Sequence, residues 1–81
     1  MPTITVRFFA AAREAFGARE SHISAGSVDE LVSTLAEASD PQAATVLSRS
    51  SFLVNSVAAT DRTAPLADGD TVDVLPPFAG G

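Results

Sequence analysis

Polar and apolar residues alternate near both ends of the chain. Residues 3–9 and residues 71–75 each carry apolar side chains at every second position, which is the pattern of a half-buried β-strand. The side chains expected to face the core are Ile4, Val6, Phe8, Val72 and Val74. Phe9 is out of step with the first set, and Leu75 falls on the face opposite the second. The sequence therefore predicts a first and a last strand that both build the core.

Helical spacing replaces this alternation in the middle of the chain. Residues 28–38 repeat apolar side chains every three or four positions, behind a capping box that opens at Ser27. A shorter helix is expected at residues 41–48, because Asp40 is a favourable N-cap and Pro41 fits a first helical turn. The sequence therefore predicts two successive helices between the first and last strands.

Shorter elements fill the rest of the chain. An alanine-rich helical turn is expected at residues 10–16, ended by Gly17. Residues 18–24 suit a second strand, although only one of them is strongly apolar. Two further short strands, at residues 51–54 and 57–59, are separated by an Asn-Ser turn. An Asp-Gly-Asp turn precedes the last strand.

This order of elements predicts an α+β domain with helices on one face of a mixed sheet. The most apolar strands usually lie at the centre of a sheet. If the first and last strands pair in parallel there, with a helix packed across them, the arrangement is a β-grasp. Pattern alone leaves other topologies open. We expect the domain to occupy residues 1–75, followed by an extended C-terminal tail at residues 76–81.

Composition and charge narrow the classes of function. The absence of cysteine excludes disulfides, a cysteine-rich zinc site and a catalytic thiol. The net charge of −5, with five arginines and no lysine, argues against nucleic acid and anionic membranes as partners. No apolar run approaches the length of a membrane span, and no secretory signal is recognised, so a cytoplasmic location is expected. After Arg62 every charge is negative, which favours a partner with basic groups at this end.

The C-terminal tail is the segment most suited to chemistry. Its sequence is Pro76-Pro77-Phe78-Ala79-Gly80-Gly81. Two prolines favour extended geometry, so the tail can project roughly 20 Å. Terminal glycines have no side chain, so they can enter a narrow channel and leave the last carbonyl open to a nucleophile. A frayed terminus is the alternative, but chance alone gives a final Gly-Gly in only about 0.5% of chains.

Other candidate residues give weaker evidence of a functional site. His22 stands without a neighbouring acid, base or thiol, so a solvated surface histidine is expected. Asp68 and Asp70 lack the further ligands of a calcium loop and are better explained as turn formers. No metal site, bound cofactor or set of catalytic residues can be assembled from the sequence, so unaided catalysis is not expected.

Motifs at the two ends resemble those of a known family. They are Phe8-Phe9-Ala10, Arg13-Glu14, Gly17, Leu66, Asp68-Gly69-Asp70, Val72, Pro76-Pro77 and Gly80-Gly81. Together they resemble the small subunits of molybdopterin synthase, which are ubiquitin-like sulfur carriers. The resemblance covers essentially the whole chain and is specific at its two ends. It implies a β-grasp fold with the parallel pairing of first and last strands that the pattern only suggested.

The resemblance also implies a reaction cycle. An activating enzyme related to ubiquitin E1 enzymes would use ATP to adenylate the carboxylate of Gly81, and sulfur would displace AMP to give a thiocarboxylate. The thiocarboxylate would enter a large synthase subunit and donate sulfur to cyclic pyranopterin monophosphate, forming the molybdopterin dithiolene. The complex implied is a heterotetramer of two small and two large subunits, in which this chain is a sulfur-donating subunit and the partner holds the catalytic residues.

Roles for individual residues follow from the same resemblance. Gly81 would bear the sulfur. Its neighbours Gly80 and Ala79 would form the threaded part of the tail, on a stem of Phe78, Pro77 and Pro76. Leu75 and Phe9 would extend an apolar docking surface, unless they pack against a helix of this domain instead. Arg13 would contact a partner, because an exposed arginine contributes little to stability.

Three other functions remain open at this stage. Sulfur carriers for thiamin or cysteine synthesis share the fold and the Gly-Gly end, although the Phe-Phe-Ala-x-x-Arg-Glu motif argues against them. A ubiquitin-like modifier would form amide bonds with target lysines through the same adenylated terminus. A simple acidic binding domain would need no tail at all.

Overall fold

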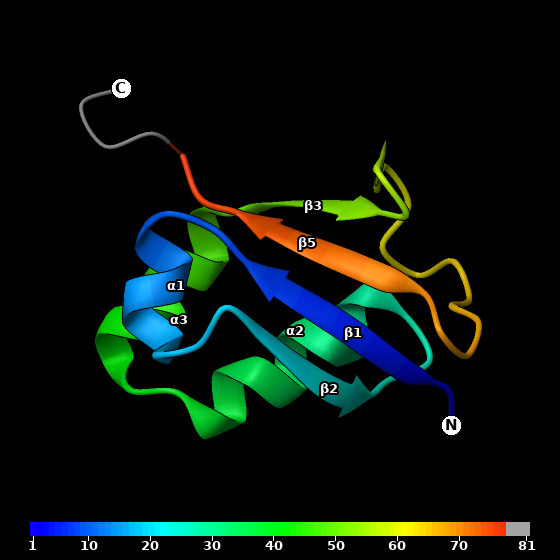
Figure 1. Cartoon of the computed structure of the whole chain (residues 1–81), viewed down its shortest axis with the longest axis horizontal. Coiled ribbons are helices and arrows are strands. Elements are labelled where there is room, and N and C mark those ends of the chain that lie inside the picture. The colour runs from blue at the N-terminus through cyan, green and yellow to red at the C-terminus, as the bar shows by residue number, and fades with distance from the viewer. Residues whose placement is uncertain (78–81) are drawn as a thin grey trace.

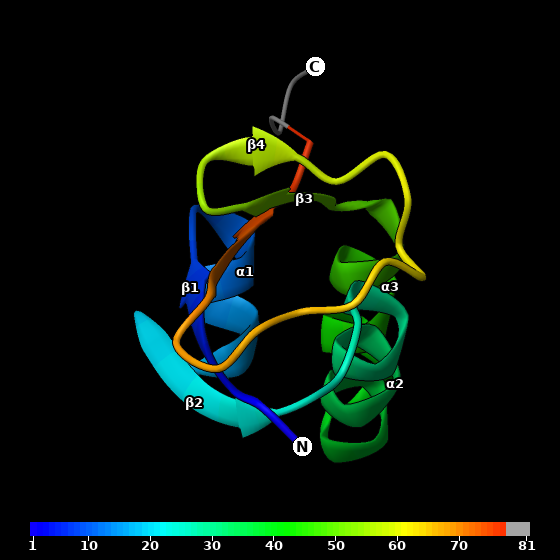
Figure 2. The ribbon, with the colours of Figure 1, turned by 90° about the vertical axis from the view of Figure 1, so that its right-hand side faces the viewer.

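One five-stranded sheet with helices on a single face makes up the computed structural model, which describes residues 1–77 (Figure 1). Its elements in chain order are β1 Thr3–Phe8, α1 Ala11–Phe16, β2 Glu20–Ser24, α2 Val28–Ala38, α3 Pro41–Arg49, β3 Ser51–Val54, β4 Val57–Ala58 and β5 Thr71–Leu75. In the perpendicular view the helices stand on one side of the curved sheet (Figure 2). We call the other side the open face. No helix among residues 1–77 is long and apolar enough to cross a membrane.

The strand order is β2-β1-β5-β3-β4. Strands β1 and β5 are parallel neighbours at the centre, with Val6 opposite Val72 and Phe8 opposite Val74. All other pairs are antiparallel. This confirms the α+β, β-grasp prediction, including the parallel pairing of the first and last strands.

The core lies between the sheet and the helices. Alternation in β1 and β5 sends one set of side chains into it, and α2 and α3 cover them with their apolar stripes. The buried apolar residues are Ile4, Val6, Phe8, Ala12, Ala25, Val28, Leu31, Leu35, Ala43, Leu47, Phe52, Val72 and Val74. The ring of Phe8 stacks on that of Phe16 from α1, with centroids 4.9 Å apart. The short first helix is therefore tied to the core through an aromatic pair.

Local chemistry sets the helix ends that the sequence predicted. The Ser27 hydroxyl accepts a hydrogen bond from the amide of Glu30 at 3.2 Å, and the Asp40 carboxylate caps α3 at the amide of Ala43. The Glu30 carboxylate reaches back to the amide of Gly26 rather than to that of Ser27, so the capping box is displaced by one residue. Gly17 ends α1 in the left-handed conformation, with φ 68°.

Small differences from the sequence-based boundaries have local causes. Strand β1 ends at Phe8 instead of residue 9, because the chain turns into α1 from Phe9 onward. Strand β2 begins at Glu20, two residues later than predicted, and β4 has only two residues. Helix α3 runs one residue further, to Arg49. Fraying of this size is normal at element ends.

The central position of β5 generates a test of the fold. Val74 is fully buried on the central strand, so Val74→Asp would bury an unpaired carboxylate at a cost of about 4 kcal/mol or more. A chain of this length has roughly 4–12 kcal/mol of stability in total. We expect loss of the cooperative thermal transition followed by circular dichroism. The matched control is Val57→Asp, since Val57 is 68% exposed; a folded Val74→Asp variant would contradict the assignment of faces.

Candidate functional site

The C-terminal tail continues the central strand of the sheet. Strand β5 ends at Leu75; Pro76 is partly buried and Pro77 is exposed. The chain therefore leaves the domain from the middle of one sheet end, above β1 and β3 (Figure 1). The remaining tail residues predicted as functional, Phe78, Ala79, Gly80 and Gly81, lie outside the described residues, so their assigned roles stay predictions.

Phe9 and Leu75 lie side by side where the tail begins. The amide of Phe9 donates to the carbonyl of Val74 at 3.3 Å, which extends the β1–β5 pairing by one bond. Both side chains are partly buried, yet neither belongs to the partly buried apolar residues that pack against the core among residues 1–77. The Phe9 ring instead lies 5.5 Å from the guanidinium carbon of Arg7, on the open face. A docking role for Phe9 and Leu75, as opposed to packing against a helix, stays a prediction.

A strained turn connects this apolar pair to α1. Ala10 has φ 50° and ψ −125°, a conformation that glycine adopts readily and alanine rarely. The turn is closed by hydrogen bonds from the amide of Ala12 to the carbonyl of Phe9 and from the amide of Arg13 to the carbonyl of Ala10, both at 3.0 Å. These bonds hold the strained residue beside Phe9, at the edge of the predicted docking surface.

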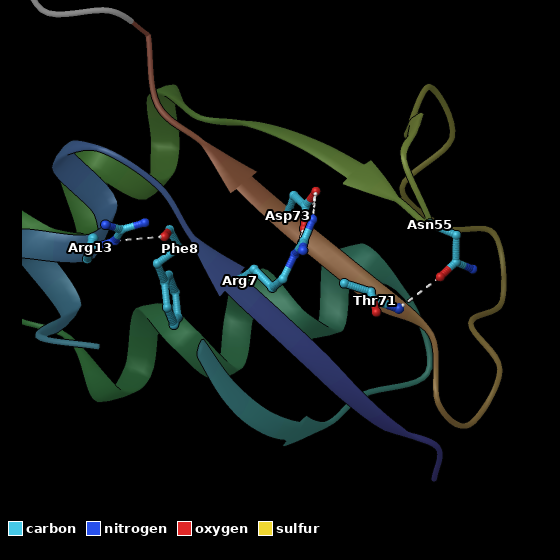
Figure 3. A network of polar contacts seen from close by, with 6 residues as sticks. All are labelled: Arg7, Phe8, Arg13, Asn55, Thr71 and Asp73. Carbon is cyan, nitrogen blue, oxygen red and sulfur yellow. Dashed lines mark hydrogen bonds and ion pairs between the residues drawn. The ribbon is translucent and has the colours of Figure 1, made fainter. Parts of the chain in front are cut away.

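Arg13 is exposed on α1. Its Nε lies 3.5 Å from the carbonyl oxygen of Phe8, at the outer limit of a hydrogen bond (Figure 3). The side chain is thus directed toward the end of β1, next to Phe9, with little binding to its own domain. Contact with a partner remains a prediction for Arg13.

An ion pair that the sequence analysis missed occupies the centre of the open face. Arg7 on β1 and Asp73 on β5 are register partners. Nε and Nη2 of Arg7 donate to the two carboxylate oxygens of Asp73 at 2.7 and 3.0 Å (Figure 3). The Asp73 side chain is 7% exposed and that of Arg7 48%. The hydrogen bond and charge of Asp73 raise the pKa of Arg7. Opposite charges at outward positions of two strands were the available signal, but using it required the register.

The other acidic residues near the C-terminus are also engaged within the domain. Asp68 accepts a hydrogen bond from the amide of Thr3 at 2.8 Å. Asp70 accepts from the amide of Ala67 and from the side chain of Asn55, and these two bonds lower the pKa of Asp70. The expectation that this end attracts basic groups is therefore weakened, because these carboxylates already have donors.

Polar contacts also join the Asp68–Asp70 turn to the β3–β4 hairpin. The side-chain oxygen of Asn55 accepts a hydrogen bond from the amide of Thr71 at 3.0 Å (Figure 3). Asn55 and Ser56 both have positive φ, as a tight hairpin turn requires. Asp68 and Asp70 are thus turn residues, as the sequence predicted. Residues 1–77 contain no group of three or more side chains arranged to hold a metal ion.

Comparisons with known proteins agree with this geometry. The ThiS family model matches residues 6–81. A complex of subunits 1 and 2 of molybdopterin-converting factor from Helicobacter pylori contains a chain that is 28% identical, with a TM-score of 0.75 over 98% of this chain and 99% of that one. A search of curated proteins gave no match.

Two further solved structures share the fold at lower identity. Small archaeal modifier protein 1 from Methanosarcina acetivorans is 24% identical, with a TM-score of 0.86 over 100% of this chain and 98% of that one. A chain of the BexX/CysO complex from Amycolatopsis orientalis is 22% identical, with a TM-score of 0.76 over 96% and 99%. Fold, motifs and family match together define a ubiquitin-like sulfur carrier. The chain belongs to the ThiS family.

The strain at Ala10 can be measured directly. Ala10→Gly should stabilise the domain by about 1 kcal/mol, because glycine adopts this conformation without a Cβ clash. For a domain of this size the melting temperature should rise by about 4–8 °C. The same substitution at Ala44, inside α3, should lower it. An equal fall in both variants would show that Ala10 is not strained.

Proposed function

We propose that this chain is the small subunit of a molybdopterin synthase and carries sulfur as a thiocarboxylate on Gly81. One observation carries the proposal: a Pro-Pro-x-x-Gly-Gly tail follows the central strand beside an apolar pair, Phe9 and Leu75, whose side chains are partly buried and do not pack against the core. The 28% identity to a chain of a molybdopterin-converting factor complex supports the choice of pathway.

The chemistry requires an unhindered terminal carboxylate. In the first step a carboxylate oxygen of Gly81 attacks the α-phosphorus of ATP, and pyrophosphate leaves. In the second step a sulfur nucleophile attacks the resulting mixed anhydride; the new C–S bond replaces the C–O bond to AMP. Glycines at positions 80 and 81 leave both faces of the reacting carbonyl open. ATP is consumed by the activating enzyme, and this chain is proposed to bind no cofactor of its own.

Sulfur donation takes place in the partner. The thiocarboxylate sulfur forms a bond to a carbon of cyclic pyranopterin monophosphate, and an oxygen substituent leaves that carbon. Water then cleaves the bond between the sulfur and the acyl carbon of Gly81, which restores the carboxylate and leaves the sulfur on the pterin. A dithiolene contains two sulfur atoms, so two loaded carriers serve each product. We propose, as the family resemblance implies, a heterotetramer of two small and two large subunits, located in the cytoplasm.

Binding and chemistry are proposed to use separate parts of the chain. Phe9, Leu75 and Phe78 supply apolar area for docking, with Arg13 at its edge, because interface cores are apolar and aromatic. Pro76 and Pro77 stiffen the stem, and Ala79, Gly80 and Gly81 enter the channel. The position of Phe9 and Leu75 outside the core supports the docking half of this division.

Two other functions are compatible with individual comparisons. The likeness to small archaeal modifier protein 1 fits a ubiquitin-like modifier, and the likeness to a CysO complex fits a sulfur carrier for another product. Both likenesses are below 25% identity and show the fold alone. The Phe-Phe-Ala-x-x-Arg-Glu motif favours the molybdopterin pathway over a carrier for thiamin or cysteine synthesis.

Removal of Gly81 tests the sulfur-bearing residue. We expect the deletion to abolish thiocarboxylate formation and to change the melting temperature by little, because a terminal residue beyond the last strand contributes little packing. Intact mass after incubation with the activating enzyme, ATP and sulfide measures the exchange of one oxygen for one sulfur. Deletion of Met1, at the other end, is the matched control. Retained sulfur loading would exclude Gly81 as the carrier residue.

Gly80→Val tests the narrow tail and the pathway together. A β-branched side chain widens the tail where both partners must admit it, so activation and sulfur donation should each fall by about tenfold or more. Binding to the large subunit should weaken less, since the apolar pair supplies the contact area.

The assay supplies thiocarboxylated chain to a cognate large subunit with cyclic pyranopterin monophosphate and measures dithiolene formation. Parallel reactions for thiazole and cysteine synthesis serve as controls. Product in only one of these controls would overturn the molybdopterin assignment.

A further inference from the structure

On the open face of the sheet, charged side chains lie next to the apolar pair, Phe9 and Leu75. One register position before Phe8, the strand pairing places Glu20 beside Arg7, Arg7 beside Asp73, and Asp73 beside Leu53. No helix of residues 1–77 covers this face (Figure 2). A partner that covers Phe9 and Leu75 and extends further along β1 and β5 therefore meets Arg7 next.

Arg7 is held in place by its own domain. Its guanidinium forms two short hydrogen bonds with the nearly buried Asp73 and packs near the ring of Phe9. A guanidinium has five N–H groups. Two of them donate to Asp73, and the other three have no acceptor among residues 1–77. The Arg7 side chain is 48% exposed, so these donors can bind water until a partner displaces that water.

We infer that Arg7 is a specificity-determining residue that selects partners with neutral oxygen acceptors opposite it. The inference rests on the proposed function, in which a partner protein docks on Phe9 and Leu75. A partner with apolar side chains at this position would leave buried donors without acceptors, which is costly. Such a partner is rejected even if it matches the apolar pair, because an unsatisfied polar group acts against the wrong partner.

Charge decides which kind of acceptor fits. Arg7 already has a carboxylate on each side, Asp73 on β5 and Glu20 on β2, and the charge of each raises the pKa of Arg7. The three side chains together carry a net negative charge. A partner carboxylate would be repelled by two carboxylates in the neighbouring strands, whereas a backbone carbonyl or a side-chain amide oxygen would not. The acceptor opposite Arg7 is therefore expected to be a neutral oxygen of the partner.

The test compares three forms of the full chain. Arg7→Met with Asp73→Ala removes the donors and the charge together, so no carboxylate is left buried without a partner. Arg7→Gln with Asp73→Asn removes the charge and keeps N–H donors. Arg49→Met, on the last turn of α3 in the helical layer, is the matched loss of one arginine. Melting temperature establishes that each form is folded.

Binding is measured by calorimetry with two probes, the cognate large subunit and the activating enzyme with ATP, at low and at high sodium chloride. For at least one probe, the methionine–alanine form should lose about tenfold or more in affinity. The glutamine–asparagine form should lose less, Arg49→Met should lose nothing, and the losses should be similar at both salt concentrations.

Three results would overturn the inference. Unchanged affinity of the methionine–alanine form for both probes would show that Arg7 contributes nothing to partner binding. Equal losses in the two double variants, or losses that disappear at high salt, would show that charge and not neutral hydrogen bonding is recognised. If the native chain fails to bind the large subunit, the molybdopterin proposal fails, and the activating-enzyme measurement still decides the role of Arg7.

Discussion

The parallel pairing of β1 and β5 is the contact on which the rest of the structure depends. It joins the two ends of the chain at the centre of the sheet, where both strands contribute fully buried side chains to the core. Strand β2 then adds to one side and β3 to the other. Because β5 is central, the tail that follows it is anchored by hydrogen bonds on both sides up to Leu75. The C-terminal tail is thereby attached to the central strand of the domain.

The same pairing gives the two faces of the sheet different compositions. Residues that alternate inward are apolar and meet the helices, so stability depends on them. Residues that alternate outward lie on the open face: the ion pair of Arg7 and Asp73, then Phe9 and Leu75 nearer to the tail, for which we propose a role in recognition. A substitution can therefore affect partner binding without loosening the core, provided that it leaves no carboxylate buried alone.

Much of this fold could be predicted from the sequence, because its strongest signals are local. Period-two alternation located β1 and β5, and the capping residues Ser27 and Asp40 placed the starts of both long helices. Strand β2 was harder, since its single strongly apolar residue, Ile23, leaves no clear alternation. The parallel pairing followed from a resemblance and not from any local pattern, because strands at opposite ends of a chain carry no sign of their mutual register.

The site was predicted less completely, for the same reason. Phe9 and Leu75 could be named from their position out of step with the core, but whether they were covered by a helix depended on tertiary packing. The ion pair of Arg7 and Asp73 joins residues far apart in sequence and becomes visible only when the register is known. The strain at Ala10 is a property of backbone angles that an alanine in a sequence does not reveal.

The nature of the cations beside the tail has a consequence for side reactions. An activated carboxyl group is an acylating agent, and an unprotonated amine is the side-chain group most apt to intercept it. All five basic residues of this chain are arginines, and a guanidinium does not lose its proton at physiological pH. Asp73 raises the pKa of Arg7 still further. Under the proposed function, the carrier thus places positive charge at the base of its tail without a lysine, so neither it nor a second copy would consume an activated Gly81 carboxyl group through a lysine.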